Sequence, residues 1–382
     1  MKKETIALAV AFSIIAGSFV STRIHFNEKQ ESKAVQTMPD TLHSYISIHP
    51  VTDTTRSLIT GYNYHLLKLF AADAGKEIDI RMAKGPREAL DSLVAGVVDI
   101  VVMPFSDSVL RDPAHADSLD VTIPIDSSTV WIVRKGCAMN TRKAECWMSD
   151  HLGSKADSID REKFFKVYSP YRSGRRKCLS PYDDIIKSYA DTLGWDWRML
   201  AAIIYAESHF HIEALSPRGA QGLMQLVPQT AKANGLENPL DPEENIAGGV
   251  RLLKKLSSRY TDIADNRTEN FKYTLAAFNA GVGRVNDCIN YALYRGKNPS
   301  YWANVRNVIP EMNDENIGDT GVVKLGKFTG VETINYVEQI VEIYNNFLRI
   351  CPDSSVRTEY HEEDIDPGTV DNDDSGLPSM PE

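Results

Sequence analysis

The sequence lacks the Cys-x-x-Cys spacing by which zinc sites and dithiol redox motifs are recognised. Its five cysteines are scattered, at positions 137, 146, 178, 288 and 351. The neighbouring His209 and His211 have no third candidate ligand beside them, so we expect neither a metal nor a cofactor. In an oxidising compartment Cys137 could pair with Cys146, or Cys288 with Cys351. Buried free thiols are the alternative, and the sequence leaves both open.

Basic charge is also scarce, since 42 Lys and Arg stand against 52 Asp and Glu. Residues 352–382 alone hold ten of the acidic residues and one arginine, so the rest of the chain is close to neutral. A nucleic-acid-binding protein needs a basic face, and we expect no such partner. The only basic cluster, residues 161–177, is typical of a solvated linker, with a contact to anionic wall polymers as the alternative. The acidic tail 352–382 is predicted to be disordered.

The N-terminus begins with Lys2 and Lys3 and continues with an uncharged apolar run over residues 6–20. This is the layout of a secretory signal, so residues 1–22 are predicted to direct export to the periplasm or cell envelope. The small residues near Ser18 and Ser21 make a poor cleavage site, which leaves an uncleaved membrane anchor as the alternative. No cysteine follows the run, which argues against a lipoprotein.

A chain of 382 residues has room for two folded units. Residues 41–136 alternate β-rich and helical stretches, which predicts a small α/β unit with right-handed crossovers. The expected strands are residues 44–49, 77–82, 98–103 and 130–134, and the expected helices are residues 62–74 and 86–95. Residues 61–70, 88–93 and 96–100 resemble the first lobe of periplasmic solute-binding proteins of the amino-acid-binding type.

A complete solute-binding protein would insert a second lobe after the strand near Val130. Only residues 137–178 are available here before the next unit, so the two-lobed clamp cannot be built in full. The missing second lobe therefore argues against capture of a small ligand, and a scaffold or docking role for a partner protein is the alternative to ligand binding. Residues 151–178 are polar and basic, contain Pro170 and Gly174, and are predicted to be a linker.

Residues 179–351 are predicted to be helical almost throughout, which makes the whole chain α+β. Ser180 and Pro181 indicate a helix start and Gly194 its end, while Asp196 can cap the next helix. The further expected helices are residues 197–208, 228–234, 243–260, 269–280, 284–295 and 331–350.

Glu207 is the candidate catalytic residue of this helical unit. It lies at the C-terminal end of residues 197–208, among apolar neighbours that include Ile203, Ile204 and Phe210. Partial burial and the negative end of the helix dipole both disfavour a carboxylate, so we expect the pKa of Glu207 to be raised. A carboxyl that is protonated at neutral pH can protonate a glycosidic oxygen.

Four separated blocks around and after Glu207 resemble the soluble lytic transglycosylase domain, in that family's order. They are Glu207-Ser208-His209-Phe210 followed by Gly222-Leu223-Met224-Gln225, then Asn245-Ile246 with Gly248-Gly249, then Ala276-Ala277-Phe278-Asn279-Ala280-Gly281, and finally Glu332-Thr333 with Tyr336-Val337. Together with the solute-binding-like front, the chain resembles the membrane-bound lytic transglycosylase F group in a shortened form. Phe278 stands where tyrosine is usual.

The resemblance implies a lysozyme-like helical fold and cleavage of the β-1,4 bond between N-acetylmuramic acid and N-acetylglucosamine in peptidoglycan. Glu207 matches the family's catalytic glutamate. The implied substrate-binding residues are Ser208, Met224, Gln225, Asn279 and Tyr336.

Hydrolysis of a glycoside normally uses two carboxylates, and the only other acid within the four blocks is Glu332, in the last of them. A single acid/base suffices if the sugar's own C6 hydroxyl attacks C1 and leaves a 1,6-anhydro end. A hydrolytic muramidase is one alternative. A wall-binding or sensing protein with a silent catalytic domain is the other.

Overall fold

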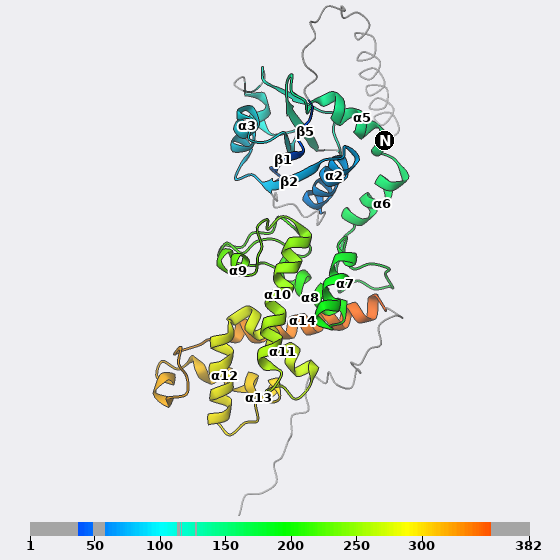
Figure 1. Ribbon diagram of the computed structural model, residues 1–382. Coiled ribbons are helices and arrows are strands. Elements are labelled where there is room, and N and C mark those ends of the chain that lie inside the picture. Colours follow the sequence, from blue (N-terminus) through cyan, green and yellow to red (C-terminus); the bar gives the residue numbers. More distant parts are fainter. Residues whose placement is uncertain (1–36, 49–57, 113–114, 116, 127, 353–382) are drawn as a thin grey trace, which may run out of the picture.

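The structure is a computed structural model that describes residues 37–48, 58–112, 115, 117–126 and 128–352. It is an α+β molecule, as predicted, with a small sheet unit at one end and a long helical part that continues away from it (Figure 1). The predicted signal or anchor (1–22) and most of the predicted acidic tail lie outside the described residues.

The sheet unit has five strands in the order β2-β1-β3-β5-β4. β1 (Thr41–Ile46) runs parallel to β2 (Glu77–Met82) and β3 (Ile100–Pro104), whereas β5 (Thr129–Arg134) is antiparallel to β3 and to β4 (Leu119–Val121).

Alternate residues of β3 face opposite sides of this sheet. Ile100 and Val102 join the core that includes α2 (Ile59–Asp73), while Val101 and Met103 join the core that includes α3 (Pro86–Ala95). α2 therefore lies on one face of the sheet and α3 on the other.

The predicted strands and helices of the sheet unit are present, but the antiparallel end of the sheet was missed. β4 has three residues, too few for a period of two to be visible in the sequence. The predicted strand at 130–134 is present as β5. It pairs antiparallel with β3, so no parallel crossover connects these two strands.

The predicted linker is only partly irregular: α5 (Thr141–His151) ends at its first residue and α6 (Lys155–Phe164) lies within it, while residues 165–178 form no helix or strand. The side chains of Asn140 and Ser154 accept hydrogen bonds from the first turns of these helices. Both helices are rich in polar residues and bury only a few side chains, and this composition hides them from a hydrophobic pattern.

The helical part is all-α apart from short turns. Its helices are α7 (Asp183–Leu193), α8 (Trp197–Ser208), α9 (Pro228–Ala233), α10 (Pro242–Tyr260), α11 (Arg267–Ala280), α12 (Val282–Tyr294), α13 (Trp302–Val308) and α14 (Val331–Ile350). Short 3-10 turns occupy Ser108–Arg111, Ile309–Asn313 and Ile317–Thr320. α13 was not predicted. The predicted helix start at Ser180-Pro181 was wrong: α7 begins at Asp183, and Ser180 donates a hydrogen bond to the Asp183 side chain from the turn before the helix.

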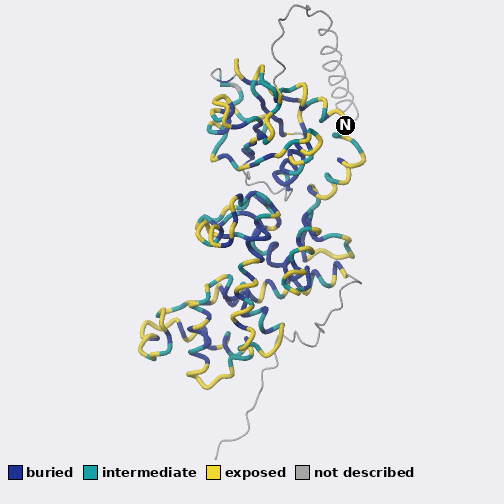
Figure 2. The backbone as a smooth tube through the Cα atoms, viewed as in Figure 1, coloured by how far each residue is buried: buried dark blue, intermediate teal, exposed yellow. Residues whose placement is uncertain are grey.

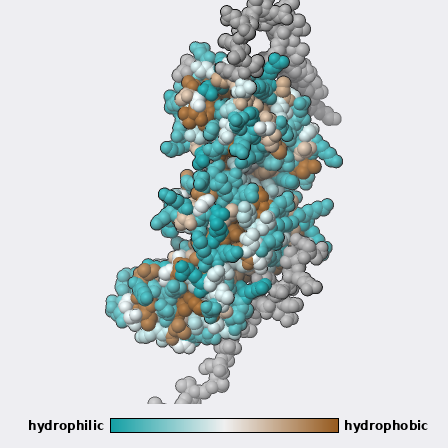
Figure 3. Space-filling model, in the orientation of Figure 1, coloured by the Kyte–Doolittle hydropathy of each residue, from teal (hydrophilic) through white to brown (hydrophobic). Residues whose placement is uncertain are grey.

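α14 packs against α8 and α11, so the last helix closes the middle of the helical part (Figure 1). Its buried residues include Val337, Ile340, Tyr344 and Phe347. The middle of the molecule is accordingly the most continuously buried region of the backbone (Figure 2). Hydrophobic surface residues gather further out, on the lobe of α12 and α13, where Leu293, Tyr294 and Leu325 are exposed (Figure 3).

The sheet unit and the helical part share one hydrophobic core and several polar contacts. The Tyr64 hydroxyl on α2 donates to Asp241, the residue that caps α10, at 2.7 Å. The side-chain amide of Asn238 donates to the carbonyl of Ile80 on β2 at 2.8 Å. A side chain at Gly61 would overlap the Tyr182 hydroxyl. The two units are therefore in close contact, while the predicted domain boundaries remain a prediction.

All five cysteines are unpaired in this structure. Among the described residues, no helix is long and apolar enough to span a membrane.

Candidate active site

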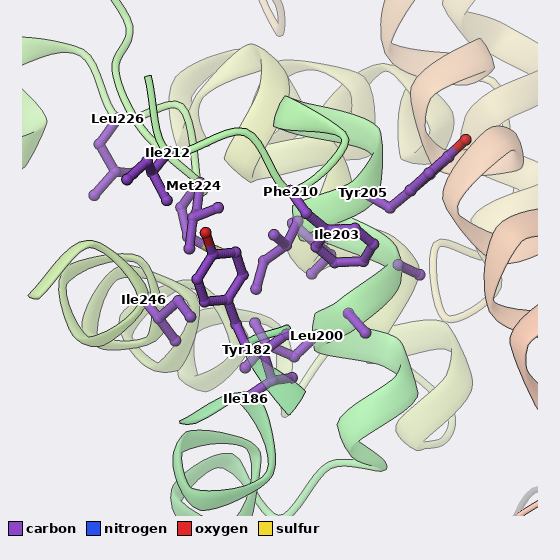
Figure 4. Close-up of a cluster of buried hydrophobic side chains, with 14 of the residues drawn as sticks. Tyr182, Ile186, Leu200, Ile203, Tyr205, Phe210, Ile212, Met224, Leu226 and Ile246 are labelled. Atoms are coloured by element: carbon purple, nitrogen blue, oxygen red, sulfur yellow. The ribbon is translucent and has the colours of Figure 1, made fainter. Parts of the chain in front are cut away.

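Glu207 occupies the last turn of α8, where the sequence predicted it. Asp196 caps the start of this helix by accepting a hydrogen bond from the Arg198 backbone N–H, and its apolar residues are almost all buried. Ile203, Tyr205 and Phe210 pack together around the end of α8 (Figure 4). Glu207 itself is half-buried beside this cluster, so its carboxyl is partly withdrawn from water.

Tyr336 on α14 donates a hydrogen bond from its hydroxyl to Oε1 of Glu207. Burial raises the pKa of Glu207 from its ordinary value of 4.5 to about 7, while the hydrogen bond from Tyr336 acts in the opposite direction. Neither influence comes from another charged group. The predicted rise in pKa is thus present, with burial as its main cause.

The loop after α8 holds the backbone in an unusual conformation. His209, Phe210 and Gln225 are the non-glycine residues of the described chain with positive φ, at 51°, 69° and 46°. Non-glycine residues with positive φ are uncommon and cluster at functional sites. All three belong to the first of the four blocks: His209 and Phe210 follow Glu207 directly, and Gln225 ends the segment Gly222-Leu223-Met224-Gln225.

Asn245 on α10 holds the segment Gly222-Leu223-Met224-Gln225 in place. Its Oδ1 accepts the Met224 backbone N–H at 2.8 Å, and its Nδ2 donates to the carbonyls of Gln221 and Pro239. Gly222 has a φ of 75°, and a Cβ at this position would overlap the Asn245 amide. Asn245 was part of the recognised pattern, but its role as the anchor of the turn was not predicted.

The remaining predicted site residues lie at the end of α8, at the end of α11 and in the turn that contains Met224 and Gln225. Ser208 is buried, and its hydroxyl bonds back to the Ile204 carbonyl. Met224 is fully buried near Tyr182 and Ile212 (Figure 4), and it would clash with a side chain at Gly249. In this arrangement both side chains support the site from within the core, and a direct contact with sugar remains a prediction.

Gln225 and Asn279 keep part of their amide groups available. Gln225 donates from Nε2 to the carbonyls of Ala214 and Gly222, both at 2.9 Å. Asn279 lies at the end of α11 and is exposed; its Oδ1 accepts a hydrogen bond from the buried Thr333 hydroxyl at 2.9 Å. Thr333 was also in a recognised block without an assigned role.

Comparisons with known proteins show which proteins the chain carrying these residues is similar to. Residues 184–300 match the family model described as the transglycosylase SLT domain. The chain is 29% identical over 318 residues to the membrane-bound lytic murein transglycosylase F of Desulfosudis oleivorans, which is 78% of this chain and 66% of that protein. The corresponding protein of Photobacterium profundum is 28% identical over 77% of this chain and 59% of its own length.

These alignments extend well beyond residues 184–300, so the similarity includes parts of the chain outside the SLT domain. The chain spans less than two thirds of the length of either relative. Among solved structures, the 70 kDa soluble lytic transglycosylase of Escherichia coli is 26% identical over 46% of this chain and 25% of its own, with a TM-score of 0.30.

Proposed function

We propose that this protein is a peptidoglycan lytic transglycosylase that cleaves the bond between N-acetylmuramic acid and N-acetylglucosamine without water, leaving 1,6-anhydro ends. The observation that carries the proposal is Glu207, a half-buried carboxyl with a pKa of about 7 inside an SLT domain. A group with this pKa can give up and take back a proton near neutral pH, as an acid/base catalyst must.

In the first step, protonated Glu207 donates its proton to the glycosidic oxygen. The bond from C1 of the muramic acid to that oxygen breaks, and the N-acetylglucosamine leaves with a new hydroxyl. The carboxylate that remains is stabilised by the hydrogen bond that Tyr336 donates to Oε1. Tyr336 therefore supports the state that the second step requires.

In the second step, the carboxylate of Glu207 removes the proton of the C6 hydroxyl of the same muramic acid. The oxygen attacks C1, a C1–O6 bond closes the anhydro ring, and Glu207 is again protonated. No water is consumed. Among the described residues, no carboxylate interacts with Glu207 strongly enough to contribute to its pKa shift, which supports this route over hydrolysis with two acids.

The proposed place of action is the cell envelope, where peptidoglycan is found. The basic and apolar N-terminus supports export, and the relatives that the chain matches are named as membrane-bound enzymes. We further propose that the sheet unit of residues 41–136 is a scaffold or a binding unit for a ligand or partner rather than part of the catalytic centre, since Glu207, Tyr336 and Asn279 all lie in the helical part.

The test is mass spectrometry of purified peptidoglycan digested with the protein, beside a Glu207→Gln variant. Anhydro-muropeptides from the wild type alone are expected. Products heavier by one water would indicate a muramidase. Binding without any product from the folded wild type would indicate a wall-binding protein and overturn the proposal.

A further inference from the structure

α14 presents two hydroxyl groups to the candidate active site from one face of the helix. Thr333 and Tyr336 are three residues apart, and residues at this spacing are neighbours on a helix surface. The Tyr336 hydroxyl donates to Glu207, and the Thr333 hydroxyl donates to Asn279. The first contact belongs to the proton transfer proposed above. The second has no part in it and needs its own explanation.

Thr333 is well placed to fix the orientation of one amide. It lies in the first turn of α14 and is 4% exposed, so its hydroxyl is held inside the protein. Its proton goes to Oδ1 of Asn279 at 2.9 Å. An asparagine amide has one acceptor side and one donor side. When Oδ1 is turned toward Thr333, Nδ2 must point the other way.

The donor side of Asn279 is free for a ligand. Asn279 is exposed at the end of α11, and its Nδ2 has no hydrogen-bond partner among the described residues. Gln225 has the opposite polarity, because its Nε2 is used by two backbone carbonyls and its Oε1 remains available. The surrounding protein thus leaves a donor available on Asn279 and an acceptor available on Gln225.

We propose that Thr333 is a positioning residue that makes Asn279 a hydrogen-bond donor to an acceptor oxygen of the glycan, either the acetamido carbonyl or a ring hydroxyl. This inference rests on the proposed function and deepens it, since it states which atom of Asn279 meets the substrate and what holds it there. Without the Thr333 hydroxyl, the amide can rotate and present its oxygen, which repels an acceptor.

The experiment compares Thr333→Val, which keeps the shape of the side chain and removes the hydroxyl, with Thr333→Ser, which keeps the hydroxyl. The rate of release of soluble muropeptides from purified glycan strands is measured over a range of strand concentrations. One net hydrogen bond corresponds to roughly a tenfold change or less. Thr333→Val is expected to lose about five- to tenfold in kcat/KM, mainly through KM, and Thr333→Ser is expected to stay within about twofold of the wild type.

A double-mutant cycle separates positioning from a general structural effect. In an Asn279→Ala background, Thr333→Val should cause no further loss, because the amide that it positions is gone. The alkaline limb of the pH profile should stay where it is in Thr333→Val, since Tyr336 still bonds Glu207. Equal losses in the valine and serine variants, losses that multiply with Asn279→Ala, or a Thr333→Val enzyme within twofold of the wild type would each overturn the inference.

De-N-acetylated strands identify the acceptor oxygen. If it is the acetamido carbonyl, the preference of the wild type for acetylated strands shrinks in Thr333→Val. If it is a hydroxyl, the valine variant loses the same factor on both kinds of strand. A wild type that releases no anhydro product would contradict the proposed function itself, whereas a wild type that is active and indifferent to Thr333 contradicts only this inference.

Discussion

The carboxyl of Glu207 is partly buried, so its ionisation in the folded protein lowers the stability of the folded state. The pKa of about 7 lies above the ordinary 4.5. Below pH 4.5 the carboxyl is protonated in both the folded and the unfolded states, so ionisation does not affect stability. As the pH rises from 4.5 to 7, the unfolded chain releases this proton more readily, and the folded state loses stability.

Glu207→Gln is therefore expected to stabilise the fold at pH 8 by roughly 1–3 kcal/mol, because the amide has no charge to bury. The gain should vanish below about pH 4.5. Urea unfolding of both proteins at pH 8 and pH 4 measures it. The same substitution should lower peptidoglycan cleavage by about 10²–10⁴-fold. The exposed Glu342 on α14 supplies the control, since Glu342→Gln should change neither quantity.

Tyr336→Phe removes the hydrogen bond that lowers the pKa of Glu207. The pKa should then rise, and the alkaline limb of kcat/KM should move to higher pH by up to about one unit. A pH–rate profile for both enzymes measures the shift. Tyr344→Phe, two turns further along α14, is the matched control, because its hydroxyl faces Asp196 instead. A limb that stays in place or moves to lower pH in Tyr336→Phe would contradict the assigned contact.

The sequence predicted which residues belong to the candidate site better than it predicted the contacts that each residue makes. The position of Glu207 at a helix end among apolar residues predicted its raised pKa. The direction of Met224 was not predictable, because it depends on how the loop after α8 packs against α10. Ser208 bonds back to Ile204 within its own helix. Thr333 and Asn245 were visible as members of a pattern, yet their partners lie 54 and 21 residues away, and no local spacing reveals such contacts.

At the scale of elements, the turn of residues 221–226 depends on Gly222. Its φ of 75° suits glycine, and a Cβ there would overlap the Asn245 amide and the Pro239 carbonyl. Gly222→Ala should cost roughly 2–4 kcal/mol of unfolding free energy, since strain and overpacking add. Gly296→Ala is the control: its φ is 69°, but it has open space around it, so only the conformational cost of about 1 kcal/mol is expected. Equal costs in urea titrations would show that the Asn245 contact does not constrain the turn.

The long helices were predicted to within a few residues, as α8, which Asp196 caps, and the 20-residue α14 illustrate. α6 and α13 were missed for different reasons. α6 is mostly charged, and its first turn is held by Ser154 rather than by a hydrophobic stripe. α13 has seven residues, too short for a helical period to appear.

At the scale of the whole molecule, the sheet unit supports the segment that leads into α10. Asn238→Ala would leave the Ile80 carbonyl without its partner and should cost roughly 1–3 kcal/mol. Its effect on kcat/KM, measured with glycan strands, reports how far this support extends to the turn that Asn245 holds. A variant as stable as the wild type would contradict the importance of the contact.

Removing residues 41–135 is expected to lower the efficiency of cleavage without abolishing the chemistry, because the proposed catalytic groups lie in the helical part. Anhydro-muropeptide yield from the truncated protein measures this. Complete loss in a protein that is still folded, as judged by circular dichroism, would contradict the division into units. The shared core of the two units could not be predicted from the sequence. The hydrophobic pattern of each unit was visible there, but not which faces of the two units pack together.

The contact between Asn238 and β2 also bears on solubility. β2 is an outer strand of the sheet, and an open strand edge invites pairing with a strand of another molecule. Here the helical part occupies a carbonyl of that edge, and the opposite edge is formed by β4, which is only three residues long. Each edge therefore offers few free backbone groups for hydrogen bonds with a strand of another molecule. If the sheet unit were produced alone, the edge of β2 would be uncovered, and self-association through that strand is the expected result.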